Sequence, residues 1–206
     1  MIFPSSGLYA ITQTDGKTTE QIAQEVAAAI KGGAVVIQYR EKRPAVADSL
    51  AEQLLSLCKK HSIPLIINDN IDLALRIGAD GVHLGKEDCN IKLAREQLGD
   101  NAIIGISCYN HLELAIAAAK KGANYVAFGR FFPSNSKPLA SPAEVQTLRK
   151  AQHKLQIPIV AIGGILPENG GQLLESGADL LAVIGGIFDQ DPEQSAKKFL
   201  HLFSTL

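Results

Sequence analysis

The chain has 206 residues, of which 46% are hydrophobic and 20% charged, and its formal net charge is -1. This length suits one globular domain, residues 1–206, with a core large enough to need no disulfides. The small net charge gives no sign of the excess Lys and Arg by which proteins bind nucleic acid or anionic membranes. Cys58, Cys89 and Cys108 lack CxxC spacing, so neither a disulfide framework nor a zinc site is predicted.

The N-terminal segment and the hydropathy pattern indicate a cytoplasmic location. The start, MIFPSSGLYAITQ, lacks a basic region followed by a long apolar region, and no apolar run approaches membrane-spanning length. Reduced thiols fit the same compartment. We therefore expect small-molecule ligands, with no nucleic acid and no membrane as partners. A homo-oligomer is compatible with the sequence, which does not fix the oligomeric state.

Short apolar, β-rich segments alternate with amphipathic segments along the whole chain, as in parallel βα units. In chain order, eight strands are predicted at Leu8–Thr12, Ala34–Arg40, Pro64–Asp69, Gly81–Leu84, Ile103–Cys108, Tyr125–Gly129, Pro158–Gly164 and Leu180–Gly186. Apolar residues at three- and four-residue spacing predict helices between them, among others at Thr19–Lys31, Val46–His61, His111–Lys121, Ala143–Leu155 and Pro192–Ser204.

Four Gly-Ala pairs join a predicted helix to the next strand. The pairs precede strands two, four, six and eight, at Gly33-Ala34, Gly78-Ala79, Gly122-Ala123 and Gly177-Ala178. Glycine after a helix permits the left-handed conformation that closes it. This fourfold βαβα repeat predicts a closed TIM (β/α)8 barrel. A doubly wound sheet is less favoured, because TQTDGKTTE after the first strand has no dinucleotide fingerprint.

The active site of such a barrel lies at the carboxyl ends of its strands. Gln38, Arg40 and Lys42 alternate at the end of strand two, so their side chains point to the same side and can grip an anionic ligand. Such residues also occur at strand ends merely as solvated charges. Function and solubility therefore both remain explanations for this segment.

Asp69 and Asp88 follow neighbouring strands, so their carboxylates can share one Mg²⁺ ion with substrate phosphate oxygens. The alternative is that Asp69 caps the helix beginning at Asn70 and Asp88 caps the helix after Cys89. We favour the metal site for the pair.

Phosphate-binding chemistry is indicated in three loops. Ser134-Asn135-Ser136-Lys137 offers hydroxyls and a lysine in a long loop after strand six, although this is also ordinary loop composition. Gly163-Gly164 and Gly185-Gly186 end strands seven and eight, where TIM barrels often bind phosphate with backbone amides. Two tight turns would explain the same glycines.

Other polar residues near the barrel mouth carry less weight. A single histidine in a strand, such as His83, is more often packed than catalytic. Cys89 and Cys108 have no evident paired base, which argues against a cysteine nucleophile. Tyr109 and Phe131 are interpreted as pocket walls.

Taken together, these motifs resemble the thiamine-phosphate synthase family. VVIQYREK, LIINDNIDLALRIGADGVHLGKED, IIGIS, GANYVAFGRFFPSNSKP, PIVAIGGI and LAVIGGIF occur in the family's order and spacing, from strand two to strand eight. The most specific combination is ADGVHLGKED with INDN and the Ser-Asn-Ser-Lys loop.

The resemblance implies a TIM barrel that couples hydroxymethylpyrimidine pyrophosphate to hydroxyethylthiazole phosphate, forming thiamine phosphate and pyrophosphate. It implies that Asp69 and Asp88 bind Mg²⁺. It implies that the pyrimidine pyrophosphate is held by Gln38, Tyr39, Arg40, Glu41, Lys42, Asn68, Ser107 and Lys137. It implies that the thiazole phosphate is held by Ser134, Asn135, Ser136, Gly164, Ile184 and Gly185.

The implied chemistry is a dissociative substitution. Mg²⁺ with Arg40, Lys42 and Lys137 can stabilise the departing pyrophosphate, so that the pyrimidine methylene becomes a carbocation before the thiazole nitrogen attacks. Ser107 joins these residues in the implied catalytic set. Positioning and electrostatics then carry the rate, and no covalent nucleophile is needed.

The chain departs from the family pattern at three places. Ser134 and Ser136 replace two usual threonines, Cys108-Tyr109 replace a Thr-His or similar pair, and Gly185 replaces a common serine. The related thiazole tautomerases are a second reading, but they carry a working histidine where this chain has Tyr109. A barrel that only binds phosphorylated metabolites is a third, against which the intact Asp69/Asp88 pair argues.

Overall fold

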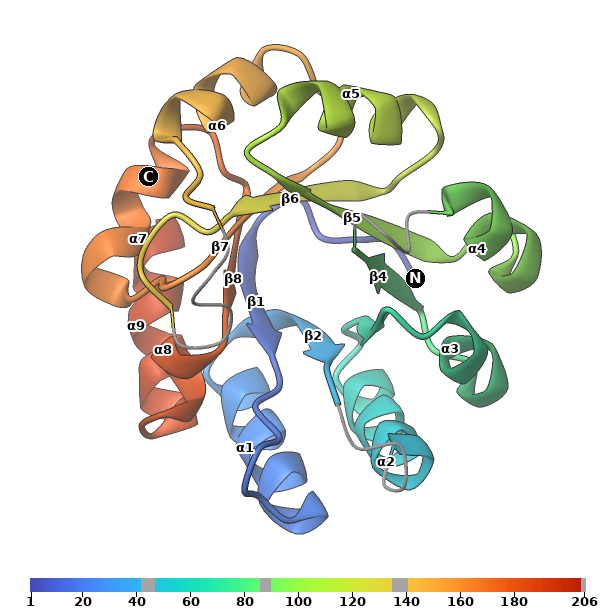
Figure 1. Ribbon diagram of the computed structural model, residues 1–206. Coiled ribbons are helices and arrows are strands. Elements are labelled where there is room, and N and C mark those ends of the chain that lie inside the picture. The colour runs from blue at the N-terminus through green and yellow to red at the C-terminus, as the bar shows by residue number, and fades with distance from the viewer. Residues whose placement is uncertain (42–46, 86–89, 135–140, 205–206) are drawn as a thin grey trace.

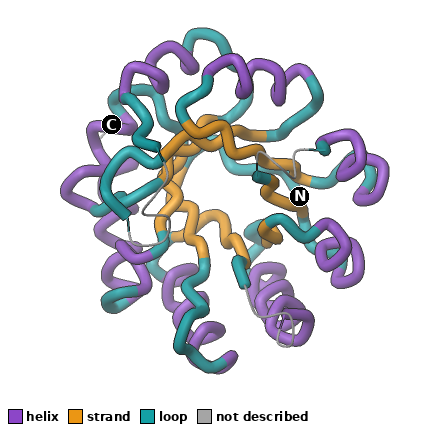
Figure 2. The backbone as a smooth tube through the Cα atoms, in the orientation of Figure 1, coloured by secondary structure: helices purple, strands orange, loops and turns teal. Residues whose placement is uncertain are grey.

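The protein forms a closed barrel of parallel strands surrounded by helices (Figures 1 and 2). The computed structural model describes residues 1–41, 47–85, 90–134 and 141–204. In these ranges eight strands pair in chain order and the last pairs with the first. They are β1 (Gly7–Ile11), β2 (Ala34–Tyr39), β3 (Leu65–Asn68), β4 (Gly81–Leu84), β5 (Ile103–Tyr109), β6 (Tyr125–Gly129), β7 (Ile159–Ile162) and β8 (Leu180–Val183).

The helices form the outer layer and confirm the predicted TIM barrel. Over the described residues they are α1 (Thr19–Lys31), α2 (Ala47–Lys60), α3 (Ile71–Ile77), α4 (Ile91–Leu98), α5 (Leu112–Lys120), α6 (Val145–Gln152), α7 (Pro167–Leu174), α8 (Gly185–Phe188) and α9 (Pro192–Ser204). Both α1 and α9 have the predicted bounds. No helix in the described part of the chain combines the length and apolar character needed to cross a membrane.

Alternation along the strands divides the core into two layers. Val36, Ile66 and Val160 belong to a cluster inside the barrel, together with Tyr9 and Tyr125. The residues between them on the same strands belong to a larger cluster that packs the barrel against the helices. Because side chains alternate across a strand, every strand except β4 contributes apolar residues to both layers, and the inward side chain of β4 is His83.

The four Gly-Ala turns have the predicted conformation. Gly33, Gly78, Gly122 and Gly177 all have positive φ, at 108°, 67°, 91° and 102°. A residue with a Cβ is strained in this region, which explains glycine at these helix ends. The predicted helix-to-strand turns are therefore confirmed.

At three of these turns, a side chain just after the glycine accepts a hydrogen bond from the backbone of the preceding strand. Asp80, Asn124 and Asp179 each lie two residues after the glycine. Their side-chain oxygens accept hydrogen bonds from the backbone N–H groups of Leu65, Ile104 and Ile159, at 2.9, 2.9 and 2.8 Å. Burial raises the pKa of Asp179, and the hydrogen bond from Ile159 partly opposes that rise. The Gly-Ala-Asp/Asn sequence thus links neighbouring strands at the amino-terminal end of the barrel.

Aromatic rings fill the lower part of the barrel. Phe3, which precedes β1, stacks on Tyr125 with ring centroids 4.0 Å apart and an interplanar angle of 6°. Gly105 on β5 makes room for this arrangement, because a Cβ there would overlap the Tyr125 ring. The open end of the barrel is therefore the carboxyl end of the strands.

Strand eight is shorter than predicted. It ends at Val183, and Gly185-Gly186 begin α8 instead of ending the strand. The amides of Ile187 and Phe188 donate to the Ile184 carbonyl, each at 3.0 Å, which closes a single helical turn. The early end of the strand leaves Gly185 at the helix start, where it lines the cavity at the open end of the barrel.

Candidate active site

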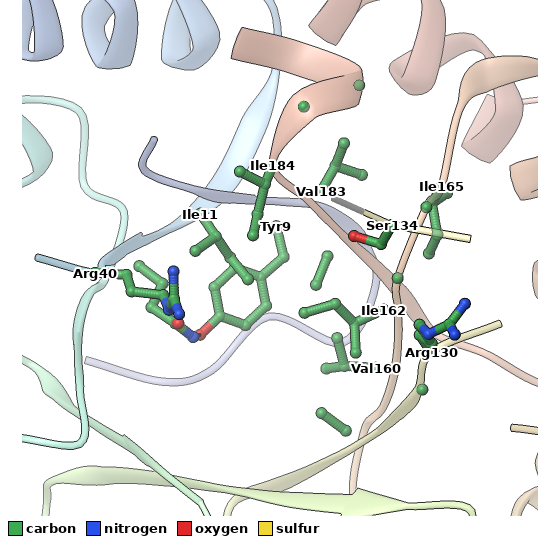
Figure 3. Close-up of a pocket in the computed structure, with 18 of the residues that line it drawn as sticks. Tyr9, Ile11, Arg40, Arg130, Ser134, Val160, Ile162, Ile165, Val183 and Ile184 are labelled. Atoms are coloured by element: carbon green, nitrogen blue, oxygen red, sulfur yellow. Dashed lines mark hydrogen bonds between the residues drawn. The ribbon is translucent and has the colours of Figure 1, made fainter. Parts of the chain in front are cut away.

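A cavity of about 430 Å³ opens at the carboxyl ends of the strands. This volume is within the range typical of small-molecule sites. Figure 3 shows Arg40 and Ser134 on opposite sides of the cavity, with Tyr9 and Ile162 between them. Eight residues predicted to bind substrate line this one pocket: Gln38, Arg40, Asn68, Ser107, Ser134, Gly164, Ile184 and Gly185.

Strand β2 supplies the polar residues on one side of the pocket. Gln38 is 3% exposed and donates from Nε2 to the Tyr9 hydroxyl at 2.8 Å. The backbone N–H of Arg40 donates to Thr12 Oγ1 at 2.9 Å, which fixes the end of β2 against β1. Arg40 and Arg130 are the two cationic side chains among the described residues that line the cavity. Arg40 lies on this side, whereas Arg130 lies on the opposite side with Ser134 (Figure 3). Both sides of the pocket therefore suit an anionic ligand.

Two other members of the segment lie away from the pocket. Tyr39 is 1% exposed and packs in the layer between barrel and helices, since it alternates with Gln38 and Arg40. Its side chain therefore does not line the cavity, and its contact with substrate stays a prediction. Glu41 does not line the cavity, and its carboxylate accepts from the Thr14 hydroxyl at 3.4 Å. Lys42 lies outside the described residues.

Asp69 follows β3 at the rim of the barrel and is held across to β4. Its Oδ1 accepts from the Gly85 amide at 3.1 Å, and its own amide donates to the His83 carbonyl at 2.8 Å. Asn68 Nδ2 donates to its Oδ2 at 2.7 Å. The cap of α3 is Asn70, whose side chain accepts from Leu73 N, so the alternative role of Asp69 as a helix cap is wrong.

The second predicted metal ligand, Asp88, lies outside the described residues. Helix α4, which follows it, is capped by Asn90, whose side chain accepts from Leu93 N. Within the described ranges no group of three His, Cys, Asp or Glu side chains is arranged to hold a metal. The exposed carboxylate of Asp69 is an oxygen donor of the kind Mg²⁺ prefers, and it fits a site completed by further ligands.

The opposite side of the pocket is built from glycine turns after β7 and β8. Gly163 and Gly164 have φ of 108° and 63°. A Cβ on Gly163 would meet Arg130, and a Cβ on Gly164 would meet the Pro133 carbonyl and lie 2.9 Å from Phe132. Both glycines are thus required by backbone conformation and by close approach of the loop after β6. The tight-turn explanation holds here, and both glycines still line the cavity.

Gly185 is different, because its φ is not in the left-handed region. A Cβ there would meet only the carboxylate of Asp189, the flexible end of an exposed side chain. Asp189 also lines the cavity. The backbone therefore permits a side chain at this position.

The loop after β6 contributes less than predicted within the described chain. Ser134 lines the pocket, whereas Asn135, Ser136 and Lys137 lie outside the described residues. Tyr109 lines the pocket as expected. Phe131 packs against the outer core, so its interpretation as a pocket wall is wrong.

Cysteine chemistry finds no support among the described residues. Cys108 is buried in the outer layer, and its thiol donates to the Ile106 carbonyl at 3.6 Å. Cys89 lies outside the described ranges. Burial and the nearby charge of Asp80 raise the pKa of the other buried thiol, Cys58, to about 12. A protonated thiol is a poor nucleophile.

Three polar residues at the floor of the pocket had no role in the sequence-based prediction: Tyr9 and Tyr125 were not considered as site residues, and His83 was set aside as more often packed than catalytic. Tyr9 and His83 line its floor, and Tyr125 lies directly beneath them. His83 Nε2 is 2.9 Å from Ser107 Oγ, and His83 Nδ1 is 2.9 Å from the Tyr125 hydroxyl. Alternation along each strand indicates which side chains point into the barrel, and this signal was available for all three residues. It does not indicate which inward side chains meet, because that depends on the register of the strands.

The fold and the site define a TIM-barrel enzyme whose pocket at the carboxyl ends of the strands has Arg40 on one side and Arg130 with the glycine turns on the other, a setting suited to small anionic molecules. The family model for thiamine monophosphate synthase matches residues 8–187. The chain belongs to this family.

Relatives and a solved structure agree along nearly the whole chain. A thiamine-phosphate synthase of Methylococcus capsulatus is 50% identical over 204 residues, covering 98% of this chain and 91% of that protein. One of Nitrosococcus oceani is 52% identical over 184 residues, covering 88% of this chain and 85% of that protein. The structure of thiamine phosphate pyrophosphorylase from Pyrococcus furiosus superposes with a TM-score of 0.87 at 33% identity, covering 98% of this chain and 96% of that one.

Proposed function

We propose that this barrel condenses hydroxymethylpyrimidine pyrophosphate with hydroxyethylthiazole phosphate, giving thiamine phosphate and pyrophosphate. The observation that carries the proposal is the construction of the pocket. Within one cavity, Gln38, Arg40 and Ser107 form a polar side, and the glycine turns at Gly164 and Gly185 form the other. Two anionic substrates can therefore lie side by side with their reacting carbon and nitrogen in contact.

The polar side suits the pyrophosphate. Arg40 offers a permanent positive charge, and Asn68 and Ser107 offer hydrogen-bond donors. Lys42 and Lys137, which lie outside the described residues, are proposed to add further positive charge. These groups stabilise negative charge as the bond between the methylene carbon and the pyrophosphate oxygen breaks. The electron pair of that bond leaves with the pyrophosphate, and the pyrimidine methylene becomes a carbocation.

The family and the position of Asp69 support a requirement for a metal ion. Asp69 and Asp88 would hold Mg²⁺, which supplies Lewis-acid neutralisation of the leaving pyrophosphate when bound. Asp69 is already fixed for this role by its hydrogen bonds from Gly85 and Asn68.

The apolar residues of the pocket protect the intermediate. Ile11, Val160, Ile162 and Ile184 line the cavity between the two polar sides. Water would capture a carbocation, and an apolar lining excludes it from the reacting atoms. The ring nitrogen of the thiazole is then the nucleophile that attacks the methylene carbon.

The thiazole phosphate is placed on the glycine side. Backbone amides around Gly164 and Gly185 can approach a phosphate closely, and the hydroxyl of Ser134 adds a donor. Asn135 and Ser136 are proposed to complete this set.

The test is formation of product from both ring substrates and Mg²⁺, followed by mass spectrometry. Thiamine phosphate should form only when both substrates are present. A folded protein that makes no product but converts a thiazole carboxylate phosphate would be a tautomerase. One that binds the phosphates without converting either would be a binding protein.

A further inference from the structure

A continuous chain of side-chain hydrogen bonds crosses the floor of the pocket. It runs from Gln38 to Tyr9 (2.8 Å), Tyr125 (2.7 Å), His83 (2.9 Å) and Ser107 (2.9 Å). These five residues come from β2, β1, β6, β4 and β5. The first four are at most 8% exposed, so water has little access to the chain.

The hydrogen atoms can be assigned by counting donors. Burial raises the pKa of both phenols, so Tyr9 and Tyr125 each keep one hydroxyl hydrogen. Gln38 Nε2 can only donate, and Tyr9 therefore accepts from it. In the described part of the chain, the other hydrogen-bonding neighbour of the Tyr9 hydroxyl is the Tyr125 hydroxyl.

The hydrogen bonds of this chain can run in two directions, and in one of them every hydrogen of the two tyrosine hydroxyls and of the His83 ring is donated. Tyr9 donates to Tyr125, and Tyr125 donates to Nδ1 of His83. His83 then carries its hydrogen on Nε2 and donates it to Ser107 Oγ. In the reverse direction Tyr9 accepts twice, and its own hydrogen is buried with no acceptor in the described chain, which is unfavourable.

The direction of the chain determines whether Ser107, which lines the pocket, offers a hydrogen or a lone pair to the ligand. With one lone pair occupied by the His83 N–H, its hydroxyl hydrogen is free to point at the ligand. In the reverse arrangement Ser107 would donate to His83 and present lone pairs to an anionic substrate. The buried chain thus decides whether Ser107 attracts or repels a pyrophosphate oxygen.

We infer that His83 is a positioning residue, which as the Nε2–H tautomer makes Ser107 a hydrogen-bond donor to the pyrophosphate leaving group. This role rests on the proposed function. His83 itself does not touch the reacting atoms. It acts through Ser107, and Tyr125 acts through His83.

Two substitutions of His83 separate this role from simple packing. Glutamine places its amide N–H where Nε2–H lies, whereas asparagine is shorter and does not reach Ser107. His83→Asn should lower kcat with the pyrimidine pyrophosphate roughly ten- to a hundredfold, the effect of one hydrogen bond to a charged group. His83→Gln should recover most of that loss. The KM for thiazole phosphate should change in neither variant, and melting temperatures check folding.

A double-mutant cycle tests whether the effect passes through Ser107. In a Ser107→Ala background, His83→Asn should cause little further loss, because its target is gone. Additive losses, or equal activity of the glutamine and asparagine variants, would overturn the inference.

The tautomer can be measured without activity. In ¹⁵N NMR of the wild-type protein, His83 should show a protonated Nε2 and an unprotonated Nδ1, and Tyr125→Phe should weaken that preference. A hydrogen on Nδ1 would refute the assigned direction even if the protein made thiamine phosphate. Conversely, the expected tautomer in a protein that makes no product would refute the proposed function and leave the chain's direction intact.

Discussion

Gly185→Ser restores a hydroxyl where the family commonly has one, and we expect it to tighten thiazole phosphate binding. The backbone permits the change, since φ at Gly185 is not left-handed and a Cβ would meet only the Asp189 carboxylate. Asp189 is exposed and can turn away. A hydrogen bond to a charged group contributes about 1.5–3 kcal/mol, which corresponds to roughly ten- to a hundredfold in affinity.

Gly185→Ala is the matched control, because it displaces Asp189 without adding a hydroxyl. Any tightening shared by both variants reports the removal of the carboxylate from the phosphate, and the serine-minus-alanine difference reports the hydrogen bond. Gly164→Ser is the contrasting case. With φ of 63° and Pro133 and Phe132 in the way, it should destabilise the fold by about 1–3 kcal/mol.

Calorimetric titration of thiazole phosphate, beside thermal melts, measures these effects. A loss of 1 kcal/mol should lower the melting temperature by roughly 2–4 °C for a chain of this size. If Gly185→Ser changed neither affinity nor stability, position 185 would not face the phosphate. The placement of the thiazole on the glycine side would then be wrong.

Three further predictions concern the metal, the leaving group and the barrel base. Asp69→Asn should lower kcat at least about tenfold. It keeps the oxygen that accepts from the Gly85 N–H, so the melting temperature should not change. If this variant had wild-type activity across a Mg²⁺ titration, Asp69 would not be a metal ligand. Lys137→Ala should depress kcat more than it raises the KM for thiazole phosphate, with poor rescue by arginine; steady-state kinetics that moved only that KM would contradict this. Asp179→Ala should cost about 1–3 kcal/mol in urea unfolding by leaving Ile159 N–H unpaired. Burial raises the pKa of Asp179 above its value in the unfolded chain, so protonation of Asp179 favours the folded state. The wild-type protein should therefore gain stability relative to Asp179→Asn as the pH falls from neutral through the folded pKa. If the stability difference between the two proteins did not change over that range, the carboxylate would not be a buried charge.

The fold was predictable from the sequence because its signals are local. Apolar runs, helix periodicity and the Gly-Ala turns each depend on a few adjacent residues, and Gly78 and Gly177 have the left-handed conformation that those turns require. The end of β8 was misplaced because Leu180–Gly186 reads as one apolar run. Helical hydrogen bonds to the carbonyls of Ile184 and Gly185 separate strand from helix there, and the residue pattern does not reveal them.

The site was predictable to the extent that its residues follow strand ends. Gln38 and Ser107 follow this rule and line the pocket, whereas the Tyr39 side chain points into the outer layer, as the alternation of β2 requires. His83 was discounted and Tyr125 was not considered, because their contacts arise between strands far apart in sequence. The contact of Tyr125 with His83 depends on the small size of Gly105 on the intervening strand, which no local pattern reveals.

The central claim is that one pocket joins two rings and releases pyrophosphate, and ³¹P NMR of a single reaction tests it most directly. With protein, Mg²⁺ and both substrates, the pyrimidine pyrophosphate and thiazole phosphate signals should fall together, while pyrophosphate and thiamine phosphate rise in equal amounts. Arg40→Ala should slow all four changes in parallel. Pyrophosphate released without thiamine phosphate, or substrate signals that persist with folded wild-type protein, would contradict the account.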